Sequence, residues 1–464
     1  MGLRNLFDVH DMTQGEPWKR IAEFSIPMLL GNFAQQLYNT ADSIIVGKYV
    51  GDNALSAVGS AMPILNLLLA LFVGVATGAG IVVSQSFGAR DRKALSENIG
   101  NCMMLSAIAT VIIMILGPVL TRPLLELLET PVSIIDWCTD YLNIFFFGIV
   151  GFFFYNMLSG ILRGLGDSFS ALGFLLIAAA LNVVLDLVFV AKFGMGVPGV
   201  ALATVIAQAI SAIFCLFKLL SMREIFDLNF HTLRLVPHTA GRILRIGIPS
   251  GITQGIMAMA GMVVQNLTNQ MGELVIACNV IIMRVDGFAM MPNFSFGQAM
   301  SVYTGQNVGA GKYDRVHKGV KQGGLMALGF SAVITVVLMF FGKYLFGFFT
   351  DTQTLIDLAV RMMRILAVGY LCMSVLQVLG GTMRGAGDTI TPMWISIFTT
   401  IILRVPTAYA LAWLTRTEEF PHGKPEALFL SLLISWTLGM LTSILVFRRG
   451  KWKEKMYNHP SVEL

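Results

Sequence analysis

Apolar residues run along this chain in long stretches, each separated from the next by a short charged or glycine-rich segment. Residues 64–84 and 99–120 are clear examples, and each exceeds the roughly 18–20 residues that a helix needs to cross the hydrocarbon of a bilayer. The pattern predicts an all-α polytopic membrane protein. Its twelve expected transmembrane helices lie at about residues 21–45, 54–84, 98–120, 135–158, 170–191, 198–220, 246–270, 275–303, 319–342, 357–380, 391–414 and 427–447.

The second half of the chain repeats the first at an offset of 221 residues. SFGAR aligns with NVGAG and LRGLGD with MRGAGD, so Gly88 corresponds to Gly309 and Arg163 to Arg384. An even number of helices in each copy predicts two parallel six-helix repeats. We expect an N-lobe at 1–220, a cytoplasmic linker at 221–245 and a C-lobe at 246–464. Both repeated motifs lie between helices, where we interpret them as structural turns.

Composition and charge agree with a membrane protein. Hydrophobic residues make up 55% of the chain and charged residues 13%, with a mean hydropathy of +0.73. The expected loops on one side hold 22 Lys and Arg residues against six on the other. This bias predicts a multi-pass protein of the cell (plasma or inner) membrane with both termini in the cytoplasm. The net charge of +5 is therefore no sign of nucleic-acid binding, and the N-terminus lacks the apolar core of a cleaved signal peptide.

Four oxygen-bearing side chains fall at one depth in the outer half of the N-lobe. Asp42 and Asp186 each precede a lysine at an outer helix end by six residues, Asn182 lies one turn before Asp186, and Thr204 begins the next helix. Two carboxylates in a low-dielectric site favour uptake of a proton or of a cation between them. Oxygen ligands suit H⁺ or a hard ion such as Na⁺. Asp42, Asn182, Asp186 and Thr204 are therefore our candidates for coupling-ion binding.

An alternative is that these acids only cap helix ends or lie at the membrane interface. The repeat argues for function, because the corresponding C-lobe positions are occupied by Leu403, Thr407 and Val264. A residue needed only for the fold would be expected in both copies.

Other polar residues inside the expected helices form weaker candidates. Asp286 and Arg404 are secondary C-lobe candidates, as a functional or a structural ion pair. Pro27 and Gly31 would let the first helix bend and act as a gate, although proline is also common in membrane helices that do not move. A substrate cavity is expected from the residues Asn32, Gln35, Gln36, Tyr38, Gln254, Met257 and Gln265.

Several segments resemble the multidrug and toxic compound extrusion (MATE) transporters, in particular their prokaryotic DinF-like branch. They are IPMLLGN and YNTADSIIVG in the first helix, SQSFGARD, LRGLGD and LNVVLDLVFV, with the two repeated loop motifs. The resemblance covers nearly the whole chain. It implies a V-shaped, two-lobed transporter of twelve helices that exports organic cations in exchange for Na⁺ or H⁺. It also implies a cation site whose members map onto Asp42, Asn182, Asp186 and Thr204.

One departure concerns the C-lobe, where another branch of the family carries acids on the seventh and tenth helices. We find none inside those helices here, which puts a C-lobe sodium site in doubt. The other functions considered are a lipid-linked saccharide flippase and, last, a membrane-embedded enzyme. All six histidines lie outside the expected helices, so no catalytic cluster is expected. We expect a monomer in the lipid bilayer with small-molecule substrates, no nucleic-acid partner, and no cofactor or metal beyond Na⁺ as a coupling ion.

Overall fold

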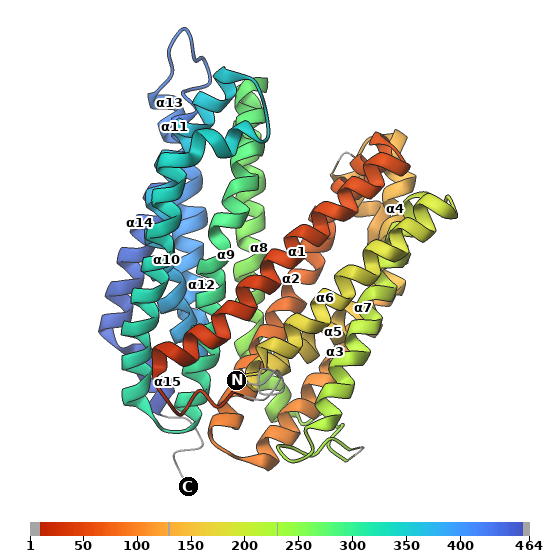
Figure 1. Cartoon of the computed structure of the whole chain (residues 1–464), viewed down its shortest axis with the longest axis vertical. Coiled ribbons are helices and arrows are strands. Elements are labelled where there is room, and N and C mark those ends of the chain that lie inside the picture. The colour runs from red at the N-terminus through yellow and green to blue at the C-terminus, as the bar shows by residue number, and fades with distance from the viewer. Residues whose placement is uncertain (1–9, 129, 230, 458–464) are drawn as a thin grey trace. The chain divides into compact units, whose positions relative to one another are not determined.

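The computed structural model describes residues 10–128, 130–229 and 231–457, and these contain helices and turns but no strand (Figure 1). The predicted cytoplasmic position of the two ends concerns residues 1–9 and 458–464, which lie outside the described residues. The first half contains α1 (Pro17–Tyr49), α2 (Asp52–Gly88), α3 (Arg92–Leu127), α4 (Val132–Phe147), α5 (Ile149–Gly164), α6 (Ser168–Asp186), the π-helix η2 (Leu187–Lys192) and α7 (Gly196–Ser221).

The second half begins with a longer helix than the apolar pattern predicts. Its elements are α8 (Pro237–Gln270), α9 (Glu273–Gly309), α10 (Tyr313–Gly347), α11 (Gln353–Gly385), α12 (Ile390–Ile397), the π-helix η3 (Phe398–Arg404), α13 (Val405–Leu414), α14 (Glu426–Arg449) and α15 (Lys451–Tyr457). Each of the twelve predicted ranges lies within one helix or within helices joined end to end, which confirms the all-α membrane fold class.

Within the described part of the chain, ten helices are long and apolar enough to span a membrane, and α4 with α5 makes an eleventh. That pair is bent by 55° around Gly148, where an added Cβ would lie 2.1 Å from Cγ1 of Val205. The bend thus brings the backbone against α7. The twelfth helix, α1, has 33 residues, but polar residues such as Asn32, Gln35 and Asp42 make it less apolar.

The helices form two compact units. Unit 1 comprises residues 1–11 and 26–251, and unit 2 comprises residues 12–25 and 252–464. Helix α1 passes from unit 2 into unit 1 between Ser25 and Ile26, beside Pro27, and α8 passes from unit 1 into unit 2 just after Pro249. Pro27 and Pro249, in the first helix of each repeat, therefore lie within three residues of the positions at which the chain passes from one unit to the other.

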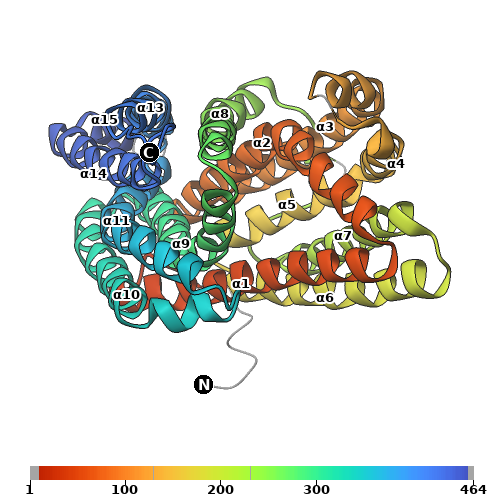
Figure 2. The same cartoon turned by 90° about the horizontal axis from the view of Figure 1, so that it is seen from above.

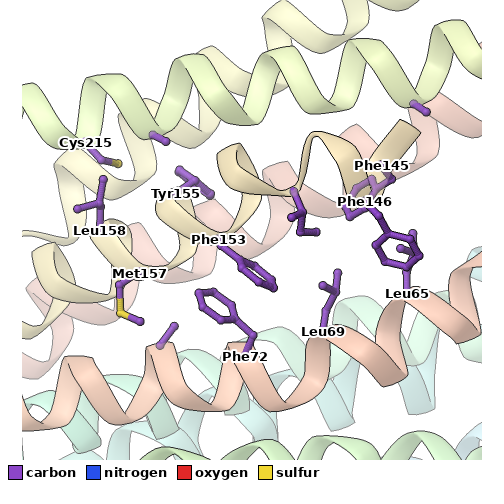
Figure 3. Close-up of a cluster of buried hydrophobic side chains, with 14 of the residues drawn as sticks. Leu65, Leu69, Phe72, Phe145, Phe146, Phe153, Tyr155, Met157, Leu158 and Cys215 are labelled. Atoms are coloured by element: carbon purple, nitrogen blue, oxygen red, sulfur yellow. The ribbon is translucent and has the colours of Figure 1, made fainter. Parts of the chain in front are cut away.

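Unit 1 is held by a buried aromatic cluster and by close glycine contacts. Phe72 of α2 stacks on Phe153 of α5 with ring centroids 3.7 Å apart (Figure 3). At Gly74 of α2 an added Cβ would lie 2.1 Å from the backbone nitrogen of Gly251 on α8. Small residues allow membrane helices to approach backbone to backbone, so α2 and the first half of α8 pack without intervening side chains.

In unit 2, α11 packs against α9, α10 and α14, and Figure 2 shows α9, α10 and α11 side by side. Tyr370 of α11, Phe346 of α10 and Phe429 of α14 are among its large, fully buried side chains. The centre of this unit is therefore the interior face of α11, which also carries the repeated arginine Arg384.

The repeated loop motifs form turns, as predicted. Asp91 and Asp167 accept hydrogen bonds from the backbone nitrogens of Ala94 and Ser170, both at 2.9 Å, and so cap α3 and α6. Gly166 and its counterpart Gly387 have φ of +91° and +90°, values that glycine adopts without strain. Arg90 (φ +57°) occupies the left-handed position that Gly311 (φ +67°) fills in the second copy.

The segment predicted as a linker at 221–245 is helical from Pro237 onward and is attached to α3. The Arg92 guanidinium donates to both carboxylate oxygens of Asp227, at 3.0 and 2.8 Å. The backbone nitrogen of Asp227 donates to Ser96 Oγ at 2.8 Å, and that of Val236 donates to Asn101 Oδ1 at 2.8 Å. Arg92 holds the pKa of Asp227 below its ordinary value by donating hydrogen bonds to the carboxylate.

Candidate functional site

The four residues predicted to bind a coupling ion come together in unit 1. Asp42 lies on α1, Asn182 and Asp186 lie on α6, and Thr204 lies on α7. Asn182 and Asp186 are fully buried, Thr204 is 9% exposed, and Asp42 is half-buried. Helix α1 and the consecutive helices α6 and α7 therefore bring two carboxylates, an amide and a hydroxyl to one place, which we call the acidic site.

The Asn182 amide is the centre of the acidic site. With its nitrogen toward the carboxylates, it donates to Asp42 Oδ1 at 2.7 Å and to Asp186 Oδ2 at 3.1 Å. Its oxygen then accepts from the backbone nitrogen of Thr204 at 3.2 Å. Of the two amide orientations, this one satisfies every neighbour, because ionised carboxylates can only accept. One amide nitrogen thus holds a carboxylate from α1 beside a carboxylate from α6.

Two tyrosines complete the acidic site. Tyr38, one turn before Asp42 on α1, lies beside the Thr204 side chain and Asp42. Tyr141 of α4 is 3% exposed and lies near enough to both carboxylates to interact with them electrostatically. From the sequence we expected Tyr38 in the substrate cavity and had no expectation for Tyr141. The only sign of Tyr141 in the sequence is a tyrosine near the outer end of an apolar helix, and such tyrosines are common in membrane proteins.

The acidic site can accept a cation. Among the described residues, Asp186 Oδ1 is buried with no hydrogen-bond partner, and a buried carboxylate oxygen is costly to leave unpaired. The π-helix η2 starts directly after Asp186, and π-helical turns are frequent at functional sites. The oxygens available to a cation are those of the two carboxylates, the Thr204 hydroxyl and the Tyr38 phenol, which suit a proton or an alkali ion.

The secondary C-lobe candidates take a different arrangement. The Tyr370 hydroxyl donates to Asp286 Oδ1 at 2.8 Å, and Arg404 at the end of η3 acts on Asp286 electrostatically from further away. Within the described residues no Asp286–Arg404 ion pair lies within 4.0 Å, so the direct pair considered from the sequence is not formed. Helix α11 also includes Asp357, which is exposed and accepts from Gln353 at 2.8 Å. The expectation of no acid in this helix was therefore wrong.

The substrate candidates are found on the two helices that carry the interior prolines. Asn32, Gln35, Gln36 and Tyr38 of α1 are half-buried in unit 1, whereas Gln254 and Gln265 of α8 are exposed in unit 2. Met257 of α8 lines a pocket within unit 2. That all of them line one substrate cavity stays a prediction.

The predicted gating residues lie inside α1. Pro27 is buried and interrupts the hydrogen bonding of this helix. Gly31, one turn later, faces Leu172 and Leu175 of α6, each 3.7 Å from an added Cβ. The helix that carries Asp42 therefore contacts α6 both at Gly31 and at the acidic site.

Comparison with known proteins gives one family. The MatE family model matches the chain twice, at residues 27–188 and 249–410, which confirms the internal duplication. The chain is 29% identical to the "Probable multidrug resistance protein YpnP" of Bacillus subtilis (strain 168), covering 96% of this chain and 98% of that protein. It is 27% identical to "Probable multidrug resistance protein YoeA" of the same organism, covering 90% and 92%.

The fold is also similar to solved structures. One is titled "Outward-facing conformation of a multidrug resistance MATE family transporter of the MOP superfamily". It matches with a TM-score of 0.88 and 23% sequence identity, covering 96% of this chain and 98% of that chain.

Proposed function

Since this chain belongs to the MatE family, we propose that it is a secondary active efflux antiporter and not an enzyme. It exports organic compounds, mainly cationic and amphipathic ones, in exchange for H⁺ or Na⁺. The family match over both halves and the relatives named as multidrug resistance proteins support export of more than one compound. We further propose that the protein works as a monomer with both termini in the cytoplasm, an orientation supported by the asymmetry of basic residues.

The observation that carries this proposal is the pair of carboxylates that meet one amide. Asp42 and Asp186 accept hydrogen bonds from the same nitrogen of Asn182, so their negative charges are held close together in a largely buried place. A proton on either acid, or Na⁺ between them, relieves the repulsion. The Asn182 nitrogen, which donates to both acids, occupies the space that a cation bridging them would need. The coupling ion therefore competes with a neutral hydrogen-bond donor and can be released again.

Exchange follows if ion and substrate favour different shapes of α1. Asp42 lies on the same helix as Pro27, and Tyr38 links the substrate candidates of α1 to the acidic site. Binding a cation at Asp42 would draw the outer part of α1 toward α6, and its loss would let α1 bend at Pro27. A ligand shifts such an equilibrium only by its differential affinity, and the coupling is reciprocal. Added substrate should therefore weaken coupling-ion binding.

Proteoliposomes test this function. The purified chain would be reconstituted with a fluorescent organic cation as substrate, and a Na⁺ gradient and a pH gradient would be imposed separately. The proposal predicts uphill substrate movement, opposite to the ion, with at least one of the two gradients. Substrate movement that is independent of both gradients, or in the same direction as the ion, would overturn it.

A further inference from the structure

The two copies of the repeated arginine differ in their partners. In α5, Arg163 Nη1 donates to Ser159 Oγ, one turn earlier, at 2.6 Å. In α11 the corresponding residues are Arg384 and Gly380, and a Cβ at Gly380 would lie 3.3 Å from Arg384 Nη1. The second guanidinium thus lies over the same turn of its helix, where the hydroxyl is replaced by hydrogen.

No other group in the described chain takes the place of that hydroxyl. The Arg384 side chain is half-buried and forms no hydrogen bond or ion pair with a described residue. The nearest acid along the sequence, Asp388, is engaged by Lys455 Nζ and Thr391 Oγ1, both at 2.6 Å. A guanidinium stays charged in proteins, so the Arg384 donors that no protein group occupies remain available to an anion.

Arg384 lines a pocket that lies entirely within unit 2. The cavity has a volume of about 80 Å³, and its wall combines hydroxyl and apolar side chains. Its polar wall includes Ser396, Thr400 and Ser443, and its apolar wall includes Met257, Met373 and Trp436. Thr400 belongs to η3, and π-helical turns are frequent at ligand sites. Drug-sized ligands need pockets of roughly 300 Å³ or more, so this cavity has room for a small group only.

We propose that this pocket is an anion site, in which Arg384 and the adjacent hydroxyls bind a carboxylate, sulfate or phosphate group. A planar guanidinium binds such groups through paired hydrogen bonds, and serine and threonine hydroxyls supply further donors. The apolar wall suits the first carbons attached to the charged group. The anion is either a free small ion or the head of an anionic amphiphile such as a lipid. The site is separate from the acidic site of unit 1, and anion binding there does not require the proposed transport activity.

Calorimetry on the purified full-length chain would test binding, with inorganic phosphate and hexyl phosphate as probes. Wild type should bind at least one probe saturably. Arg384→Gln should weaken binding about tenfold or more, the effect of losing a hydrogen bond to a charged group. Gly380→Ser, which gives Arg384 the partner that Arg163 has, should weaken binding while keeping the charge. It also provides a test if Arg384→Gln does not fold. The matched control, Arg163→Gln in unit 1, should leave affinity within about twofold, because that arginine already has a partner.

The source of the anion follows from the probes. Saturable binding of inorganic phosphate identifies a free ion. Binding of hexyl phosphate alone, lost in nanodiscs that contain phosphatidylglycerol but kept in phosphatidylcholine nanodiscs, identifies a lipid headgroup. The proposal is wrong if neither probe binds wild type saturably, if Gly380→Ser and Arg384→Gln both bind as wild type does, or if Arg163→Gln loses as much affinity as Arg384→Gln.

Discussion

Replacing Asn182 with alanine should strengthen binding of the coupling cation while slowing transport. The amide donates to Asp42 at 2.7 Å and to Asp186 at 3.1 Å. Alanine removes both hydrogen bonds and leaves two neighbouring carboxylates whose repulsion only a cation can relieve. The cation-bound state is less affected, because there the cation replaces the amide. The substitution therefore raises the free energy of the empty site more than that of the occupied site.

The magnitude follows from the two hydrogen bonds. Each hydrogen bond to a charged group contributes about 1.5–3 kcal/mol. We use the lower value, because Asp42 is half-buried, and we count one hydrogen bond and not two, because one amide nitrogen donates to both acids. A difference of about 1.5 kcal/mol corresponds to about tenfold in affinity. The cation concentration that gives half-maximal exchange in proteoliposomes should fall by about that factor, and turnover should fall because release is slower.

The control for this experiment is Ser211→Ala. Ser211 is also fully buried in unit 1, and its hydroxyl donates to the Phe174 carbonyl at 3.1 Å, away from the acids. Its half-maximal concentration should stay within about twofold of wild type. A half-maximal concentration unchanged in Asn182→Ala would refute the reasoning. An increase of tenfold would show that the amide binds the cation directly and does not take its place.

Three other predictions concern topology, the linker and α1. Single cysteines on a cysteine-free background should react with an impermeant reagent from outside intact cells at position 192 but not at position 90; labelling at 90 would reverse the orientation. The linker should stay resistant to protease from neutral pH down to the ordinary carboxyl range. The pKa of Asp227 is lower in the folded chain than in the unfolded chain, so its ion pair stabilises the fold at pH values above the unfolded-state pKa and is lost only as the pH falls through the folded-state pKa. Asp227→Asn should make the linker sensitive to protease at pH 7, and resistance equal to that of wild type would contradict this. Pro27→Ala should reduce the effect of substrate on ion binding more than it reduces substrate affinity itself, measured by calorimetry, whereas Pro63→Ala in α2 should change neither.

The hydrophobic pattern predicts most of the helices because crossing a membrane requires long apolar stretches. The pattern does not predict helix ends or bends where the need for apolar residues does not determine them. Helix α8 begins at Pro237 because its first turns, which contain His238, Thr239 and Arg242, carry polar contacts: Thr239 bonds to Glu97, and Arg242 donates to Gln85 Oε1 at 2.7 Å. The 55° bend between α4 and α5 lies among apolar residues on both sides, so no change of polarity marks it.

The two acids, the amide and the hydroxyl of the acidic site could be predicted from depth, because helices of known direction place residues at known heights. Depth does not give the rotation of each helix, so it could not show that Tyr141 of α4 lies near Asp42 and Asp186. The role of Arg384 was missed for another reason. The repeat makes it look equivalent to Arg163, and only the structure shows that replacing Ser159 by Gly380 removes a partner.

The central claim is that Asp42 and Asp186 bind the coupling cation together, and uphill export in proteoliposomes tests it most directly. Asp42→Asn and Asp186→Asn should each insert and fold, retain downhill substrate movement, and lose accumulation driven by the ion gradient. Asp286→Asn in unit 2, whose carboxylate accepts from Tyr370, is the matched control and should keep accumulation. The account is contradicted if both unit 1 variants accumulate substrate at wild-type rates, or if only the Asp286 variant fails.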